Sequence, residues 1–323
     1  MLAIGIQGSP LKNGSTDYLL ARVMAEIESR GARVNIIDVP RKDIRPCRGC
    51  GFCEKKGFCV INDDDMSGEI YGLLREAEIV VAASPVFFYS VTAQLKALID
   101  RTQTLWSRKY RFRLADPFKK TRKGCFLSMG GSRGRQLFDG VNLVAQYFFD
   151  AVDASFAGSL FFRSIETPAD MRSTPGLSKN IQDLVSQSLM PPVARKKVLF
   201  ACRENACRSQ MAGAYARHMG SDRLDVMTAG SSPAETVNPL MVQAMAEEGF
   251  DMAFLTPRPL EETLEQFQPD VIVTMGCGEE CPFIPGVVRM DWDLPDPADE
   301  SIAFMKKVRD EIAEKVSDLL NSL

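Results

Sequence analysis

Two cysteines, an arginine and a serine follow an apolar run in the last third of the chain. The run is VLFA at 198–201, and the stretch CRENACRSQ at 202–210 comes next. Cys202 and Arg208 bracket a short loop where the pattern predicts a strand followed by a helix. Backbone amides in such a loop bind an oxyanion, and an arginine grips two of its oxygens. The positive electrostatic field of the amides and the arginine also stabilises a thiolate at Cys202. The motif therefore predicts a nucleophile and an oxyanion site in one turn.

The stretch VLFACRENACRSQMA resembles the phosphate loop of low-molecular-weight protein tyrosine phosphatases and thioredoxin-coupled arsenate reductases. The resemblance continues through residues 228–251 and spans 197–323. It implies that Asn205 shapes the loop and that Ser209 hydrogen-bonds the thiolate. The commonest family form has Thr-Gly after the nucleophile, whereas this chain has Arg203 and Glu204.

This chemistry also needs an acid for the departing oxygen. The single histidine, His218, lies at helical spacing from apolar residues, which predicts a packing role. Members of the resembled family place an aspartate before a proline at the corresponding point, which maps to Asp296. Asp291 and Asp293 are the alternatives.

Two further thiols favour reduction over hydrolysis. Cys277 and Cys281 follow the apolar run DVIVTM and can relay a disulfide away from Cys202. The resemblance to the reductases includes this pair, although theirs is usually more widely spaced. We therefore expect arsenate reductase activity. A tyrosine phosphatase, a zinc or cluster role for these thiols, and a non-enzymatic oxyanion sensor or electron carrier are the alternatives.

A second loop with anion-binding character lies near the start of the chain. The stretch GSPLKNGST at 8–16 follows the apolar run LAIGI and combines glycines with hydroxyl and amide donors. Glycines allow a ligand to approach the backbone closely. The donors are Ser9, Asn13, Ser15 and Thr16. They predict an uncharged phosphate cradle, with a capped turn as the alternative.

The stretch SPVFFYSVTAQLKALIDR at 84–101 offers a backbone edge and aromatic rings to a flat cofactor. With the first loop, it resembles the flavodoxin-like reductases that bind FMN. The resemblance implies NAD(P)H as reductant, a homo-oligomer through this domain, and two further sets of flavin contacts. These are Pro85, Val86, Phe87 and Phe88 in the second loop, and Ser128 and Gly130 in a third.

Four cysteines lie between those loops with the spacing C-x2-C-x2-C-x5-C: Cys47, Cys50, Cys53 and Cys59. The spacing is too compact for a zinc ribbon but suits four thiolates around a cube. The segment resembles the cysteine motif of iron-sulfur flavoproteins, which implies a 4Fe-4S cluster near FMN. Reduced thiols, a disulfide pair and zinc stay open as alternatives.

The apolar runs that precede these motifs predict two doubly wound α/β domains. Short apolar runs at 2–6, 34–39 and 78–84 alternate with segments long enough for helices, as do those at 198–201, 223–229 and 270–275. Paired prolines at 188–196 suit a linker. We therefore expect a flavodoxin-like domain over 1–188 and a phosphatase-like domain over 196–323.

Composition narrows the setting of this chemistry. The 323 residues carry a formal net charge of −3, which argues against nucleic-acid and membrane-surface binding. The N-terminal stretch lacks the features of a signal peptide, and no apolar run is long enough for a membrane span. We therefore expect a cytoplasmic protein with reduced cysteines. Tethering should favour electron transfer from the flavin domain to the disulfide, with thioredoxin as the alternative donor.

Overall fold

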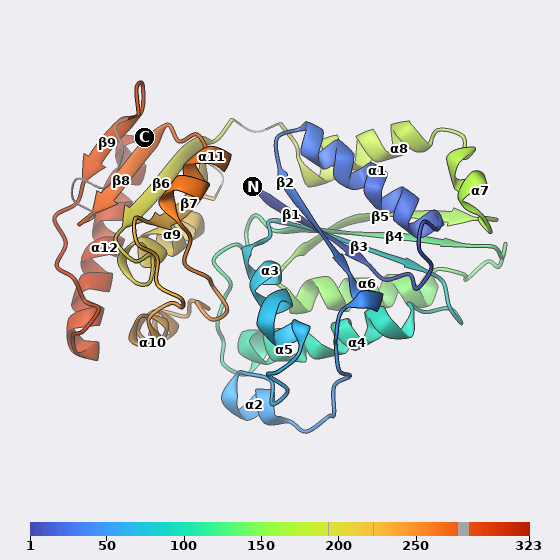
Figure 1. Ribbon diagram of the computed structural model, residues 1–323, viewed down its shortest axis with the longest axis horizontal. Helices are drawn as coiled ribbons and strands as arrows, with labels where there is room; N and C mark the ends of the chain where they lie inside the picture. The colour runs from blue at the N-terminus through green and yellow to red at the C-terminus, as the bar shows by residue number, and fades with distance from the viewer. Residues whose placement is uncertain (193, 222, 277–283) are drawn as a thin grey trace. The chain divides into compact units, whose positions relative to one another are not determined.

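The computed structural model describes residues 1–192, 194–221, 223–276 and 284–323. The chain divides into two compact units (Figure 1). The first comprises residues 1–113 and 121–192, and the second comprises residues 114–120 and 193–323. Within the described residues, no helix is both long and apolar enough to cross a membrane.

The first unit is built on a five-stranded parallel sheet with the order β2-β1-β3-β4-β5. Its strands are β1 (Leu2–Gln7), β2 (Arg33–Asp38), β3 (Ile79–Pro85), β4 (Lys123–Gly130) and β5 (Ser155–Arg163). The three central strands are buried almost throughout because helices cover both faces. β2 is an edge strand and is largely exposed despite its apolar sequence.

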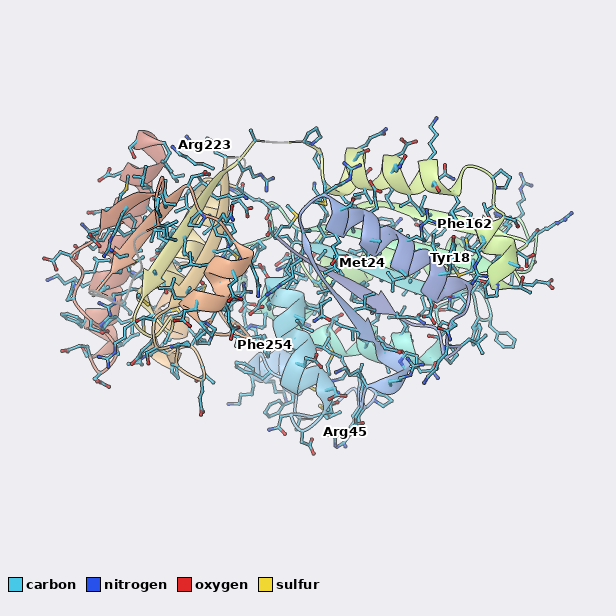
Figure 2. All side chains as sticks on the ribbon, turned by 45° about the horizontal axis from the view of Figure 1, so that its top comes forward. Tyr18, Met24, Arg45, Phe162, Arg223 and Phe254 are labelled. Atoms are coloured by element: carbon cyan, nitrogen blue, oxygen red, sulfur yellow. The ribbon has the colours of Figure 1, made fainter. Side chains whose placement is uncertain are left out.

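Helices cover both faces of this sheet (Figure 1). On one face lie α1 (Ser15–Ser29), α7 (Pro168–Arg172), α8 (Leu177–Asp183) and η3 (Leu184–Leu189). The other face carries α3 (Tyr71–Glu76), α4 (Ala93–Arg101), α5 (Gln103–Tyr110) and α6 (Asp139–Ala151). The short elements η1 (Val39–Arg41), α2 (Phe52–Lys56) and η2 (Met66–Ile70) belong to the connection between β2 and α3. Met24 and Phe162, labelled in Figure 2, belong to the core beneath α1.

The second unit has a four-stranded parallel sheet with the order β7-β6-β8-β9. Its strands are β6 (Lys196–Cys202), β7 (Leu224–Gly230), β8 (Val271–Met275) and β9 (Val288–Asp291). The larger core lies beneath α9 (Arg208–Met219), α10 (Pro239–Glu247) and α12 (Ile302–Ser322), and a smaller one includes residues of α11 (Leu260–Gln266). The predicted fold class, two doubly wound parallel sheets, is confirmed.

A short segment from the middle of the first unit's sequence packs into the second unit. We call residues 114–120 the strap. Ala115 pairs with the backbone of the second unit, donating to the Gly249 carbonyl at 2.7 Å and accepting from the Asp251 N–H at 2.9 Å. The buried Phe118 ring lies 4.3 Å from the Arg217 guanidinium carbon. The chain therefore passes between the units at the strap as well as at residues 192–193.

Candidate functional site

The loop between β6 and α9 is held from outside through its carbonyl groups. The carbonyls of Cys202, Arg203, Glu204 and Ala206 accept hydrogen bonds of 2.8–3.2 Å from backbone N–H groups at 231–238. The C=O and the N–H of one trans peptide unit point in opposite directions. Carbonyls that face outward therefore leave the N–H groups of the same peptide units facing the interior of the loop. Gly230 permits this packing, because a Cβ there would lie 2.6 Å from the Arg203 oxygen.

Cys202 ends β6 and lies beside the first turn of α9. Its Sγ lies 3.0 Å from the Ser209 Oγ and accepts a 3.2 Å hydrogen bond from the Asn205 N–H. The side chain is 3% exposed. Hydrogen-bond donors and a helix N-terminus both stabilise negative charge on sulfur. The site therefore suits a nucleophilic thiolate.

Asn205 is the centre of a buried hydrogen-bond network. Its backbone is left-handed, with φ of 52°, a conformation that asparagine tolerates better than most residues. Its Nδ2 donates to the Ser209 Oγ at 2.7 Å. Its Oδ1 accepts from the Arg258 N–H at 2.9 Å and the Gln210 Nε2 at 3.1 Å. The side chain thus fixes both the loop and the hydroxyl beside Cys202.

Arg208 and Asp296 form an ion pair at the rim of the loop. The Arg208 Nη2 lies 2.6 Å from the Asp296 Oδ2, and Nη1 donates to the Leu294 carbonyl at 3.2 Å. The arginine is buried, whereas 56% of the aspartate side chain is exposed. Gly276 has a left-handed backbone, with φ of 73°, which favours glycine at this position. A buried fork and an accessible carboxyl group can serve as oxyanion holder and acid.

The second unit has three other cysteines, of which the structure describes one, Cys207. Cys277 and Cys281 lie outside the described residues. The preceding strand ends beside the nucleophile, because Met275 pairs in register with Cys202. Cys207 is buried within the loop, and burial raises the pKa of its thiol to about 12. Cys207 is therefore protonated at neutral pH, in contrast to the thiolate needed for attack.

His218 lies away from this loop, at the end of α9. Its ring packs edge-on against Phe250, with ring centroids 5.2 Å apart. Burial, together with the charges of Lys120 and Lys119, lowers the pKa of His218. These contacts agree with the packing role expected from its helical spacing.

Three loops of the first unit meet at one edge of its sheet. Gln7 pairs in register with Ala83, and Pro85 pairs with Met129, so β1, β3 and β4 end together. Such an edge is where open α/β sheets bind ligands. Gly8 packs tightly at this point, because a Cβ would lie 2.9 Å from the Ala83 oxygen.

The predicted donors of the first loop fall into two groups. Ser9 is buried and accepts from the Leu11 N–H, and Thr16 donates to the Met129 sulfur at 3.1 Å. Asn13 is exposed, with a left-handed φ of 54°, and Ser15 is the first residue of α1. Asn13, Ser15 and the amides of the helix N-terminus are thus best placed to meet an anion.

The second loop is a tight hairpin of aromatic residues. Phe87 and Ser90 exchange two backbone hydrogen bonds of 2.9 Å. Phe88 and Tyr89 between them both have left-handed backbones, with φ of 47° and 62°. Phe88 is fully exposed, whereas Pro85 and Val86 are half-buried. Left-handed bulky residues are unfavourable and are concentrated at functional sites.

The third predicted loop begins where β4 ends. Ser128 is fully buried, and its hydroxyl donates to the Ser84 carbonyl at 2.7 Å. Gly130 is the last residue of β4, and a Cβ there would lie 3.2 Å from Leu137. Ser128 therefore joins two strand ends, while the backbone from Gly130 onward follows the common edge.

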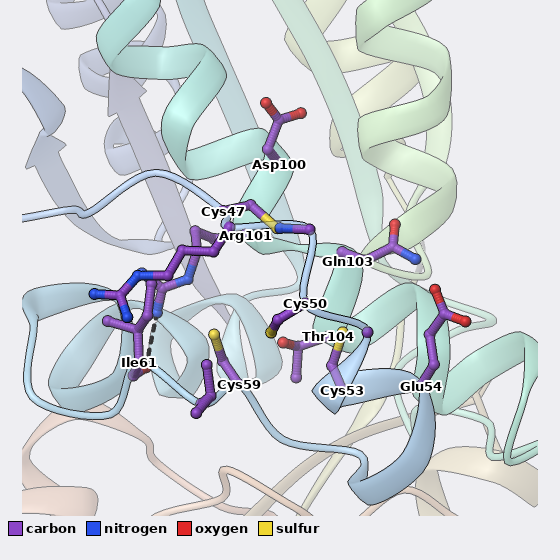
Figure 3. Close-up of a pocket in the computed structure, with 14 residues that line it drawn as sticks. Cys47, Cys50, Cys53, Glu54, Cys59, Ile61, Asp100, Arg101, Gln103 and Thr104 are labelled. Carbon is purple, nitrogen blue, oxygen red and sulfur yellow. Dashed lines mark hydrogen bonds between the residues drawn. The ribbon is translucent and has the colours of Figure 1, made fainter.

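The four cysteines of the compact motif line one cavity of about 400 Å³ (Figure 3). Left-handed glycines at 49, 51 and 57 let the chain wrap around it. The Ser107 hydroxyl lies 3.7 Å from the Cys53 sulfur. Burial, with smaller contributions from Cys47 and Cys59, raises the pKa of the Cys53 thiol. The thiols are therefore close enough to influence one another.

The spacing of these thiols bears on what they hold. In the described part of the chain, no three His, Cys, Asp or Glu side chains are arranged to bind a single metal ion. The four cysteines that line the cavity offer the thiolate ligands that an iron-sulfur cluster uses.

Known proteins match the two parts separately. Residues 197–323 match the family of low molecular weight phosphotyrosine protein phosphatases. A glutaredoxin arsenate reductase from Synechocystis sp. is 33% identical over 127 residues, covering 39% of this chain and 96% of that protein. The chain belongs, through residues 197–323, to the low molecular weight phosphotyrosine protein phosphatase family. A thioredoxin-dependent arsenate reductase structure from Corynebacterium glutamicum is 29% identical and covers 46% of this chain and 76% of that one, with a TM-score of 0.36.

The first part of this family member matches a different group. Residues 1–138 match the NADPH-dependent FMN reductases. An iron-sulfur flavoprotein from Methanosarcina thermophila is 38% identical over 133 residues, covering 41% of this chain and 65% of that protein. The chain thus spans slightly less than two thirds of that relative. Both resemblances predicted from the motifs are confirmed, and the chain joins an FMN reductase-like domain to an arsenate reductase-like domain.

Proposed function

We propose that this protein is an oxidoreductase that reduces arsenate to arsenite at Cys202. The observation that carries the proposal is the arrangement at the end of β6. There, Ser209 and Asn205 contact the nucleophilic sulfur, and Arg208 pairs with an accessible aspartate. The similarity of this domain to a glutaredoxin arsenate reductase supports the assignment.

The steps follow from the roles of these side chains. The Cys202 thiolate attacks arsenic while Arg208 and the loop amides hold the other oxygens, and Asp296 gives a proton to the departing oxygen, which leaves as water. The Cys277 thiolate then attacks the Cys202 sulfur. The sulfur-arsenic bond breaks, and its electron pair leaves with arsenic as arsenite. A disulfide between Cys202 and Cys277 is the oxidised product.

The oxidation must then leave the catalytic loop. Attack of the Cys281 thiolate on Cys277 would release the Cys202 thiolate and leave a Cys277–Cys281 disulfide. That disulfide needs two electrons before another arsenate can react. A phosphatase would need neither thiol, because water hydrolyses its cysteinyl phosphate.

The first domain is the proposed source of those electrons. Its three converging loops fit FMN, since β1, β3 and β4 end at one edge of the sheet and α1 offers its N-terminus to a phosphate. FMN held there would supply hydride acceptance from a nicotinamide and electron transfer to an acceptor such as a disulfide. Asn13 and Ser15 would hold the phosphate, and the hairpin at 85–90 would border the ring.

The compact motif is the proposed site of a 4Fe-4S cluster held by Cys47, Cys50, Cys53 and Cys59. Such a group supplies one-electron transfer when bound. A cytoplasmic location, which keeps these thiols reduced, and a homo-oligomer through the first domain complete the proposal. An external dithiol protein such as glutaredoxin or thioredoxin is the alternative donor.

A single-turnover assay tests the reaction. Flavin-free protein with its thiols fully reduced is mixed anaerobically with arsenate, and arsenite is quantified. We expect about one arsenite per chain, with none from Cys202→Ser. Bound arsenate returned unchanged would indicate a sensor. Hydrolysis of an aryl phosphate without arsenite formation would indicate a phosphatase.

A further inference from the structure

A buried arginine lies next to the four-cysteine cavity. Arg101 is the last residue of α4, lines the cavity, and is 1% exposed (Figure 3). Helix α4 begins directly after the aromatic hairpin, where the N-cap Thr92 donates to the Gly8 carbonyl. One nine-residue helix therefore joins the proposed flavin edge to the cysteine motif.

The guanidinium of Arg101 binds both ends of the cysteine loop. Its Nη1 donates to the Arg45 carbonyl at 2.8 Å, two residues before the first cysteine. Its Nη2 donates to the Ile61 carbonyl at 3.0 Å, two residues after the last cysteine. These two hydrogen bonds hold the ends of the cysteine loop together, and we call this arrangement the clasp.

Asp64 completes this arrangement. Its carboxylate accepts from both terminal nitrogens of Arg101, at 2.5 and 3.2 Å, and both side chains are fully buried. It also accepts from the Arg45 N–H at 3.1 Å. Burial favours the neutral acid, but these hydrogen bonds outweigh that effect and lower the pKa of Asp64. The pair is thus ionised, and its geometry is fixed by several bonds.

One donor of Arg101 has no partner. The Nε–H is buried and finds no acceptor in the described part of the chain. A buried donor without an acceptor is costly, so an unpaired one on a residue that lines a cavity points to a missing ligand. The nearby cysteines would bring in a group with negatively charged sulfurs, which accept such a hydrogen bond.

We propose that Arg101 is a positioning residue for the group held by the four cysteines. Its terminal nitrogens close the loop, and its Nε–H is reserved for a sulfur of that group. The second role rests on the proposed cluster, whereas the first concerns the polypeptide alone. A buried positive charge at this position would also favour the reduced, more negative form of a cluster.

Hydrogen exchange on metal-free protein tests the clasp without any cluster. Arg101→Gln and Asp64→Asn should speed exchange of the amides at 43–67 by about tenfold or more. The matched control is Arg108→Gln, because Arg108 donates to the Gly57 carbonyl of the same loop but does not line the cavity. Its effect should be confined to the residues around 57. Unchanged exchange at both loop ends in Arg101→Gln would overturn the clasp.

Anaerobic reconstitution with ferrous iron and sulfide tests the reserved donor. Wild type should take up iron and sulfide in equal amounts. Arg101→Gln should retain several-fold less iron, with a lower midpoint potential. Arg101→Lys keeps the charge but lacks the Nε donor, so its potential should fall by a smaller amount. Equal potentials in all three proteins would overturn the donor role. A wild-type protein that binds no iron would overturn both the proposed cluster and the donor role. The hydrogen-exchange experiment on metal-free protein would still test the clasp.

Discussion

The loops that follow β1 and β6 share a plan but differ in their side chains. Each follows a central strand of a parallel sheet and leads to the N-terminus of a helix. Each also contains an asparagine with a left-handed backbone, Asn13 with φ of 54° and Asn205 with φ of 52°. The fold thus presents backbone amides and a helix N-terminus to an anion twice in one chain.

The two loops differ in the contacts that their asparagines make. Asn205 is fully buried and bonds to Ser209, Gln210 and the backbone of Arg258. Asn13 is exposed, and its side chain has no hydrogen-bond partner among the described residues. Of the two loops, the second contains a cysteine and an arginine. On the proposed function, the backbone would supply binding in both loops, and the side chains would determine whether the bound group reacts.

The largest effect we expect comes from a thiol outside the second loop. Cys277→Ser should stop multiple-turnover arsenate reduction while leaving any aryl phosphate hydrolysis unchanged, because hydrolysis needs only the loop and its acid. Arsenite release and phosphate release are measured on the same preparation. Undiminished arsenate turnover would show that another thiol accepts the oxidation.

Removal of the acid should cost less. Asp296→Asn should slow hydrolysis of an aryl phosphate with a poor leaving group by about 10²- to 10⁴-fold, the range for general acids. A substrate whose leaving group needs no proton should be affected much less. Equal losses for both substrates would mean that the aspartate only holds Arg208.

The two asparagines should respond differently to replacement by glycine, which keeps the left-handed backbone. Asn205→Gly leaves several buried groups unpaired and should lower kcat/KM for arsenate by about 10²-fold. Asn13→Gly removes one exposed side chain and should weaken FMN binding by about three- to tenfold. Steady-state kinetics and flavin titration measure these effects. Equal effects would contradict the view that side-chain hydrogen bonds organise the loop after β6, whereas the loop after β1 depends on its backbone.

The strap should affect stability with little effect on chemistry. Phe118→Ala removes a buried ring and its contact with Arg217, so it should lower the free energy of unfolding of the second unit by about 2–4 kcal/mol. Denaturant unfolding with a probe in the second unit measures the change. Phe112→Ala, at a 40% exposed ring outside the strap, is the control. Equal destabilisation by both would mean that the strap contributes no specific packing.

Much of the fold could be predicted because buried parallel strands are nearly continuous apolar runs. β5 and β9 were not predicted, because glycine and serine interrupt the apolar run in SFAGSLFFR and charged residues interrupt it in VRMD. The last helix, α12, buries Met305, Val308, Ile312, Val316 and Leu319, which recur at helical spacing in the sequence.

Other features depend on contacts that no local pattern reveals. The strap pairs Ala115 with residues more than a hundred positions later. In the sequence, Arg101 is only the last residue of the stretch at 84–101, and its proposed role depends on Asp64 and on carbonyls at both ends of the cysteine loop. Motifs thus predict candidate reactive side chains, whereas the contacts that hold these side chains in place can be seen only in the structure.

Arsenite formed per chain, with NADPH as the sole reductant, tests the central claim most directly. The FMN-loaded protein is supplied with arsenate and NADPH, without glutaredoxin, thioredoxin or any added thiol. We predict many arsenite molecules per chain, and none from Cys202→Ser. A yield that stops at about one per chain would contradict electron supply by the first domain, and no arsenite at all would contradict arsenate reduction itself.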